Sequence, residues 1–374
     1  MNRQYSFIIV LSLLSWIMVS CQGFEQHIER SPSNNDFTDR VDSLVISTMN
    51  RYNIPGLAIG LVSGDSIRYA KGYGIKTIQD TLPVTEFSNF HTASISKLIT
   101  AQAIMMLVEE NRISLDDRLP ARVPNLRYSD KRVEEITIRQ LLNHTSGLPD
   151  VSSYEWGNNH QSDRSLEQYV LSLNLKPEMD PSSQYHYSNL AYNILGYVIE
   201  RVTGTSFELY VKEHILDPNG MSGSDFRYYL IPDSLRTSPH SKNWLTGNVY
   251  VRKTYPYTRE HGASSTLNSS ASDLSKWMIS FMESMIANNG ENVFTQMTQP
   301  DFRAYPYIGL GFQLGTLESR ATIGHYGGDK GYRSYLLMIP EEETGLVLLA
   351  NCDYNEDFRQ EILHPLAGLM LKNN

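Results

Sequence analysis

The chain has 374 residues with 41% hydrophobic and 20% charged side chains, a composition typical of globular proteins that excludes extensive disorder. Its formal net charge is −9 and it has no basic runs, which argues against nucleic acid as the main partner. No fixed repeat or biased tract is present, so collagen, coiled-coil and low-complexity architectures are excluded as well.

The first residues are typical of a secretory signal peptide. One positive charge, Arg3, precedes an apolar run over residues 7–19 that is short for a membrane span. The residues directly before Cys21 resemble a bacterial lipobox, which predicts cleavage after residue 20, export to the periplasm or cell surface, and a lipid anchor on Cys21. Plain secretion with cleavage nearby is the alternative. Cys352 would then lack a disulfide partner and is expected to be a small buried side chain.

Residues 22–36 are polar and are expected to form a tether. The apolar periodicity that follows predicts a helix over residues 37–52. Two strands are expected at residues 56–62 and 67–74, because hairpin turn chemistry, Ser63-Gly64-Asp65, lies between them.

Strand patterns return near the C-terminal end of the chain. Between about Thr92 and Thr266 helical patterns dominate, separated by loops that contain Pro and Gly. The expected C-terminal elements are four strands and a closing helix, at residues 308–317, 320–326, 332–339, 345–351 and 356–371.

Strands at both ends of the chain with helices between them predict an α+β fold. The simplest packing joins the terminal strands into one antiparallel sheet flanked by the terminal helices, so that residues 37–91 and 267–374 form a sheet lobe. Residues 92–266 then form an all-helical lobe. An active site is expected in the crevice between the two lobes.

Ser94 and Lys97 lie three residues apart at the start of a long apolar helix, so their side chains share one face. Thr92 is the expected N-cap, which places Ser94 in the first turn, where backbone N–H groups lack intrahelical partners. A nucleophilic serine needs an adjacent base, and a lysine desolvated by apolar neighbours can serve. Because Ser-x-x-Lys is expected about once by chance in a chain of this composition, the helix-start context carries the argument.

A second motif, Tyr187-Ser188-Asn189, immediately precedes a helix. Ser188 is the expected N-cap of that helix and Gly204 its C-terminal stop. A tyrosine held at a helix start can share a proton with a nearby lysine and serine. The amide of Asn189 offers a substrate both a donor and an acceptor.

A third motif, His325-Tyr326-Gly327-Gly328, ends a predicted strand. The glycines allow a substrate to lie along the edge of that strand. The backbone N–H of Gly328 is a candidate to complete an oxyanion hole with the N–H of Ser94.

In this order the motifs resemble those of the penicillin-recognising serine hydrolases related to class C β-lactamases. The family pattern is Ser-x-x-Lys, then Tyr-x-Asn or Tyr-x-Ser, then Lys/His-x-Gly. Here the pattern stands as Ser94/Lys97, Tyr187/Asn189 and His325/Gly327, and residues 138–150, 189–204 and 264–278 are also similar to the family. The resemblance covers the chain from about Gly56 to its C-terminus.

The resemblance implies a two-lobed β-lactamase-like fold and an acyl-enzyme mechanism. Ser94 would be the acylated nucleophile, and Lys97 and Tyr187 would exchange its proton. Asn189 would touch the substrate amide, and His325 would give electrostatic support to Tyr187.

The family also implies that the N–H groups of Ser94 and Gly328 hold the oxyanion. One residue departs from the family pattern. Where β-lactamases and penicillin-binding proteins carry a small hydroxyl between Lys/His and Gly, this chain has Tyr326. A phenol there is expected to fill the space beside Ser94 that a substrate carboxylate would occupy, which favours small esters or D-configured amides over β-lactams.

The sequence therefore predicts an exported serine hydrolase that cleaves an ester or amide of a small-molecule or peptide substrate without a cofactor. No metal-ligand spacing of His or Cys residues is present, and His144 is expected to hold a loop. A β-lactamase or D-Ala-D-Ala carboxypeptidase is the alternative among enzymes. A non-catalytic binding lipoprotein on the same fold is the alternative from another class, against which the complete set of Ser94, Lys97 and Tyr187 argues.

Overall fold

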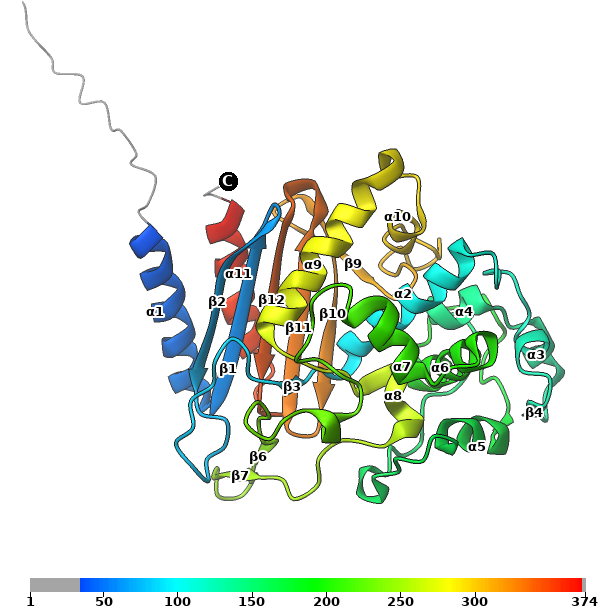
Figure 1. The fold of residues 1–374 in the computed structure, drawn as a ribbon, viewed down its shortest axis with the longest axis horizontal. Helices are drawn as coiled ribbons and strands as arrows, with labels where there is room; N and C mark the ends of the chain where they lie inside the picture. The colour runs from blue at the N-terminus through cyan, green and yellow to red at the C-terminus, as the bar shows by residue number, and fades with distance from the viewer. Residues whose placement is uncertain (1–33, 372–374) are drawn as a thin grey trace, which may run out of the picture.

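The computed structural model describes residues 34–371 and is built around a six-stranded antiparallel sheet (Figure 1). The strand order is β2-β1-β12-β11-β10-β9, so the first and last strands of the chain are neighbours in the sheet. The strands are β1 (Gly56–Ser63), β2 (Ser66–Gly74), β9 (Gln313–Leu317), β10 (Arg320–Asp329), β11 (Tyr332–Ile339) and β12 (Thr344–Ala350).

Both faces of the sheet are covered, which explains why β1 and β12 are apolar at almost every position. Helices α1 (Asn34–Tyr52) and α11 (Phe358–Leu371) lie on one face, and α9 (Ala271–Ile286) packs on the other (Figure 1). The buried side chains accordingly form two clusters, one under α1 and α11 and a larger one that continues into the helical lobe. The α+β fold predicted from the sequence is confirmed.

The helical lobe stands beside the β10 side of the sheet (Figure 1). Its two long helices, α2 (Ser96–Glu109) and α6 (Asn189–Thr203), pack against each other and against the short helix α8 (Gly262–Ser265). The shorter helices are α3 (Leu119–Arg122), α4 (Ile138–Leu142), α5 (Ser165–Ser172), α7 (Phe207–Val211), α8 (Gly262–Ser265) and α10 (Val293–Met297). The short strand pairs are β3 (Phe90–His91) with β8 (Asn268–Ser269), β4 (Arg127–Tyr128) with β5 (Asn174–Leu175), and β6 (His240–Lys242) with β7 (Val249–Val251).

One expected strand is shorter than its sequence suggested. The apolar run that begins at Ile308 pairs as β9 only from Gln313 onward. Gly311 has a φ of 92°, and a side chain there would meet Ala101 of α2 at 2.5 Å. The left-handed backbone at this glycine ends any extended segment, and Leu310 before it donates its backbone N–H to the carbonyl of Met297 instead, at 2.9 Å.

Cys352 is fully buried, and burial raises the pKa of its thiol to about 12, which confirms the expected small buried side chain. Cys21 and the predicted signal segment lie outside the described residues. Within residues 34–371 we find no helix that is both long and apolar enough to cross a bilayer.

Candidate active site

Ser94 lies in a tight 3-10 turn, Ala93–Ile95, directly before α2. The turn is bound to the backbone of Leu267, because the Thr92 hydroxyl donates to its carbonyl at 2.9 Å and the Ser96 hydroxyl accepts from its N–H at 2.9 Å. Thr92 therefore precedes the turn as predicted but does not cap it with its side chain. Ala93 has a φ of 49°, so the residue before Ser94 is held in the left-handed region, which alanine rarely adopts.

Lys97, the second residue of α2, is fully buried and makes three hydrogen bonds. Its Nζ donates to Ser94 Oγ at 3.0 Å, to Asn189 Oδ1 at 2.6 Å and to the carbonyl of Ser264 at 2.7 Å. The oxygens of Asn189 and Ser264 can only accept, so two N–H groups stay committed to them. When Lys97 loses a proton, the free lone pair therefore faces Ser94.

Burial lowers the pKa of Lys97 to about 7, an effect that the negative charges of Asp150 and Asp329 partly offset. A lysine with this pKa is divided between its two protonation states near neutral pH. It is therefore suited to accept a proton from Ser94 and to return it within one catalytic cycle.

Tyr187 donates a hydrogen bond from its hydroxyl to Ser94 Oγ at 2.9 Å. The residue is placed by the start of α6, where Ser188 is the N-cap and its hydroxyl accepts from Ala191 N–H, as predicted. Burial raises the pKa of Tyr187 far above that of free tyrosine, although the hydrogen bond to Ser94 acts in the opposite direction. Tyr187 is thus a neutral donor, and of the two groups bonded to Ser94 Oγ, Lys97 is the one suited to accept its proton.

His144 supports Tyr187 from beneath. Its ring lies 4.4 Å from the Tyr187 ring between centroids, and its Nδ1 accepts from the Ser188 N–H at 3.1 Å. Burial and the nearby charge of Lys97 lower the pKa of His144 well below its ordinary value, so the ring is neutral. These contacts agree with the holding role expected from the sequence.

Asn189 contacts Lys97 rather than pointing freely into solvent. Its Nδ2 donates to Asp150 Oδ2 at 3.0 Å and its backbone N–H donates to Asp150 Oδ1 at 2.7 Å. These two bonds fix the amide orientation, since the nitrogen faces Asp150 and the oxygen must face Lys97. Asp150 ends the family-like segment at residues 138–150, but no local pattern there predicts its contact with Asn189.

The third motif lies on β10, whose side chains alternate between the two faces of the sheet. Gly327 faces the nucleophile turn, because a Cβ there would lie 2.3 Å from the Thr92 carbonyl and 3.4 Å from Ala93 Cβ. Gly328 follows and is exposed. His325 is buried 6.2 Å from the Tyr187 ring between centroids, and burial together with Lys97 lowers its pKa to about 3. Its influence on Tyr187 is therefore that of a neutral ring.

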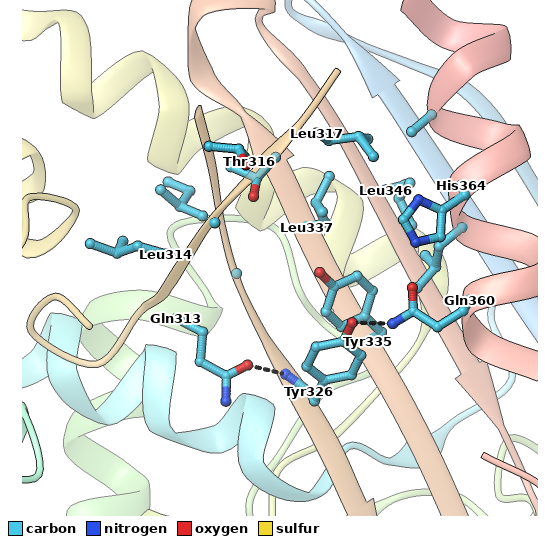
Figure 2. Close-up of a pocket in the computed structure, with 16 residues that line it drawn as sticks. Gln313, Leu314, Thr316, Leu317, Tyr326, Tyr335, Leu337, Leu346, Gln360 and His364 are labelled. Atoms are coloured by element: carbon cyan, nitrogen blue, oxygen red, sulfur yellow. Dashed lines mark hydrogen bonds between the residues drawn. The ribbon is translucent and has the colours of Figure 1, made fainter. Parts of the chain in front are cut away.

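Tyr326 does not occupy the space beside Ser94, so the placement predicted from the sequence is wrong. Its ring stacks on Tyr335 with centroids 3.9 Å apart, and its hydroxyl accepts a hydrogen bond from Gln360 of α11 (Figure 2). The side chain borders a cavity of about 330 Å³ between β9, β10 and α11. The reason is strand alternation: His325 and Gly327 face the helical lobe, so Tyr326 faces α11.

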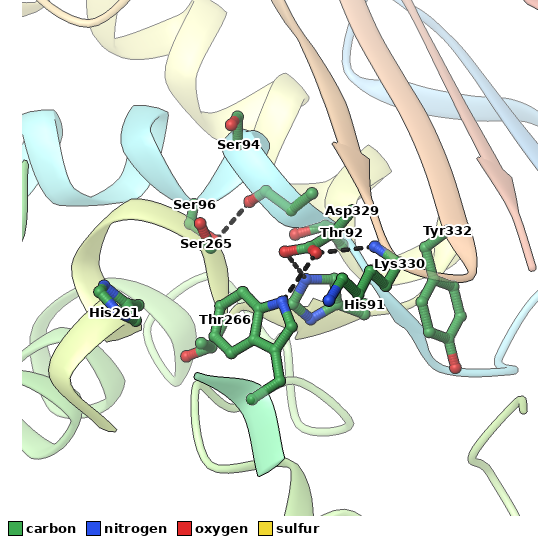
Figure 3. Close-up of polar contacts among 12 residues, drawn as sticks. His91, Thr92, Ser94, Ser96, His261, Ser265, Thr266, Asp329, Lys330 and Tyr332 are labelled. Carbon is green, nitrogen blue, oxygen red and sulfur yellow. Dashed lines mark hydrogen bonds and ion pairs between the residues drawn. The ribbon is translucent and has the colours of Figure 1, made fainter. Parts of the chain in front are cut away.

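A partly buried carboxylate outside the three sequence motifs, Asp329, lies at the end of β10 (Figure 3). Asp329 Oδ2 is 3.3 Å from His91 Nε2, and Asp329 Oδ1 accepts from the Trp156 indole N–H at 3.1 Å. Trp156 stacks on Tyr154 with centroids 4.6 Å apart. The contact therefore joins an aromatic loop of the helical lobe to the strand that carries Gly328.

Two cavities flank this aromatic loop. One of about 1230 Å³ reaches Asp150 and His261, and another of about 740 Å³ reaches Gly328 and Asp329. Tyr154 lines both cavities, so the loop that carries it forms a wall between them. Among the described residues, no group of three His, Cys, Asp or Glu side chains comes together to hold a metal ion.

The fold and the arrangement of the three motifs define a protein of the β-lactamase class, and comparison with known families agrees. The sequence profile of the beta-lactamase family matches residues 41–367, so the chain belongs to that family.

Two curated relatives are each 26% identical to the chain. Protein flp of Staphylococcus aureus matches over 330 residues, which are 85% of this chain and 64% of that protein. Penicillin-binding protein 4* of Bacillus subtilis matches over 342 residues, 86% of this chain and 73% of the relative. The chain thus spans less than two thirds of the length of the first relative.

Solved structures show the same fold. The octameric penicillin-binding protein homologue from Pyrococcus abyssi is 27% identical, with a TM-score of 0.75 over 90% of this chain and 78% of its own. A structure of SurE has the same TM-score over 90% of this chain and 76% of its own, but at 21% identity it shows the fold alone.

Proposed function

We propose that the protein is a serine hydrolase that cleaves an ester or amide through an acyl-enzyme on Ser94. The observation that carries the proposal is the double hydrogen bond at Ser94 Oγ, from Lys97 at 3.0 Å and from Tyr187 at 2.9 Å. An adjacent base and a second proton-carrying group are what a serine needs in order to act as a nucleophile.

In the proposed reaction, neutral Lys97 takes the Ser94 proton while Oγ forms a bond to the substrate carbonyl carbon. The carbonyl π electrons move to oxygen and give a tetrahedral oxyanion, which the N–H groups of Ser94 and Gly328 would stabilise. Collapse of this intermediate breaks the bond to the leaving group, which receives a proton through Tyr187 from Lys97. Water then attacks the acyl-enzyme by the same steps and releases the acid.

The test is covalent labelling followed by intact-mass analysis. Wild-type protein treated with a fluorophosphonate should gain one adduct on Ser94 and should hydrolyse a p-nitrophenyl ester. Ser94→Ala should do neither, with a nearly unchanged melting temperature, whereas Ser47→Ala in α1 should behave as wild type. Labelling that persists in Ser94→Ala would refute the assignment.

Three classes of substrate fit this acyl-enzyme chemistry, and they can be compared directly. The name of the Bacillus subtilis relative makes penicillin the natural competitor to simple esters, and a D-Ala-D-Ala carboxypeptidase is the other alternative. Parallel exposure to a penicillin, a D-Ala-D-Ala peptide and p-nitrophenyl esters separates these activities. A protein that binds one of them without turnover or adduct would instead be the non-catalytic lipoprotein.

We further propose that the protein is exported and lipid-anchored through Cys21, with residues 37–374 as its catalytic domain. The support is the layout of the first residues, a charge at Arg3 followed by an apolar run that ends at a cysteine. The enzyme would then work at the periplasmic or outer face of a bacterial membrane.

A further inference from the structure

We propose that Arg359 is a positioning residue for the oxyanion hole. Its guanidinium donates to the carbonyl of Gly327, and this bond would keep the N–H of Gly328, in the same peptide, pointing toward Ser94. This inference rests on the proposed function, because it concerns how the same site stabilises its transition state.

Arg359 extends from α11 toward the strand that carries the third motif. It is 8% exposed, and its Nη1 donates to the carbonyl of Gly327 at 3.0 Å and to that of Ser334 at 3.2 Å. Nη2 donates to Glu356 at 2.9 Å, and the Tyr326 ring covers the group with its centroid 4.9 Å from Cζ. A buried arginine is thus directed at the backbone of β10.

The carbonyl of Gly327 and the N–H of Gly328 belong to one planar peptide group. In a trans peptide these two groups point in opposite directions, so fixing one fixes the other. Pairing of Gly327 with Ser334 of β11 already restrains this peptide, but glycine on both sides leaves its plane few steric limits beyond that pairing. Arg359 adds a charged donor to the same carbonyl and so strengthens the restraint.

The paired residues Gly327 and Ser334 also lie against Thr92, directly before the Ala93–Ile95 turn that holds Ser94. Ser334, the partner of Gly327 in the sheet, donates from its hydroxyl to the Thr92 carbonyl at 2.7 Å. The Cα of Gly327 is so close to Thr92 that a Cβ would lie 2.3 Å from that carbonyl. The peptide that carries the Gly328 N–H therefore begins at a residue in close contact with the turn that holds Ser94.

Charge gives Arg359 a second effect. A hydrogen bond from a cation to a peptide carbonyl polarises the peptide and makes its N–H a stronger donor. The N–H of Gly328 would then stabilise negative charge better than an ordinary backbone amide.

The experiment compares a p-nitrophenyl ester with the matched thionoester, in which sulfur replaces the carbonyl oxygen. Sulfur is a weak hydrogen-bond acceptor, so its acylation depends little on the oxyanion donors. Acylation rates are measured by intact mass for wild type, Arg359→Met and Arg359→Lys. Arg359→Met should lower the oxygen-ester rate by about 10- to 100-fold, somewhat less than loss of a whole donor, and leave the thionoester rate within about threefold.

Two variants serve as controls. Glu356→Gln removes the ion pair of Arg359 but leaves its bonds to the carbonyls, and should keep the wild-type ratio of the two rates. Arg359→Lys keeps a cation in the same place and should recover part of the oxygen-ester rate. The inference would be overturned if Arg359→Met lowered the acylation rates of both esters equally, or if the wild type were acylated by both esters at equal rates. A wild type that fluorophosphonate does not label at Ser94 would instead refute the proposed function.

Discussion

Asp150 accepts both hydrogen bonds that Asn189 donates, one from the backbone N–H at 2.7 Å and one from Nδ2 at 3.0 Å. The amide oxygen of Asn189 is thereby turned to Lys97, whose Nζ lies 2.6 Å away. A carboxylate for which no contact with Ser94 is found thus sets the orientation of the amide oxygen that holds Lys97, and with it the direction of the Lys97 lone pair. It also acts on that lysine through its charge.

We expect kcat/KM for a p-nitrophenyl ester to rise with pH through an apparent pKa of about 7. The sign follows from the role of Lys97, because only its neutral form accepts the Ser94 proton and that form increases as pH rises. Lys97→Arg, which stays protonated, should lower kcat by about 10²- to 10⁴-fold. The exposed Lys276→Arg should keep the wild-type profile, and a flat profile between pH 5 and pH 9 would contradict the role of Lys97.

Asp150→Asn should move the acid limb of this profile to lower pH. The carboxylate raises the pKa of Lys97, so its neutralisation lowers that pKa further. The variant also loses one of the two acceptor oxygens that orient Asn189, and kcat should fall by about tenfold, the size of one lost hydrogen bond to a charged group. Asp180→Asn, an exposed carboxylate paired with Arg132, is the matched control. An acid limb that stays in place would show that Asp150 acts only on the fold.

Tyr326→Thr should lower stability and leave substrate choice nearly unchanged. The substitution removes the stack on Tyr335 and the bond from Gln360, which together should cost about 1–3 kcal/mol of unfolding free energy. Because the ring lies on the α11 face, the ratio of ester to cephalosporin turnover should change by less than about threefold, or about 0.7 kcal/mol. Tyr326→Phe keeps the stack and should lose less stability. A large rise in cephalosporin turnover in Tyr326→Thr would instead indicate that the Tyr326 ring blocks the substrate carboxylate beside Ser94.

Radiolabelled palmitate should enter the full-length protein and not Cys21→Ala when both are expressed in a bacterial host. The reason is that lipid transfer requires the thiol directly after the cleavage site. Cys352→Ala is the matched control, since that thiol is fully buried and should leave labelling unchanged. A mature N-terminus away from residue 21 would exclude the anchor while leaving secretion intact.

Much of this protein follows from short-range sequence patterns. The strand and helix order, the N-cap at Ser188 and the stop at Gly204 depend on periodicity and capping within a few residues. The sequence also predicts that the side chains of Ser94 and Lys97 lie close together, because the two residues are one helical turn apart. Strand alternation also places His325 and Tyr326 on opposite faces of β10.

Tertiary structure alone decided the contacts between distant segments. Asp150 contacts Asn189, Asp329 contacts Trp156, and Arg359 contacts Gly327. The partners are separated by 32 to 173 positions in the sequence, so no local sequence pattern predicts these contacts. Such pairs form because the sheet, α11 and the helical lobe pack together, and packing is set by the whole core rather than by neighbours in sequence. The sequence by itself thus determined which elements form and which groups can react. The packing of those elements decided which side chains orient the reactive groups and on which face of β10 each one lies.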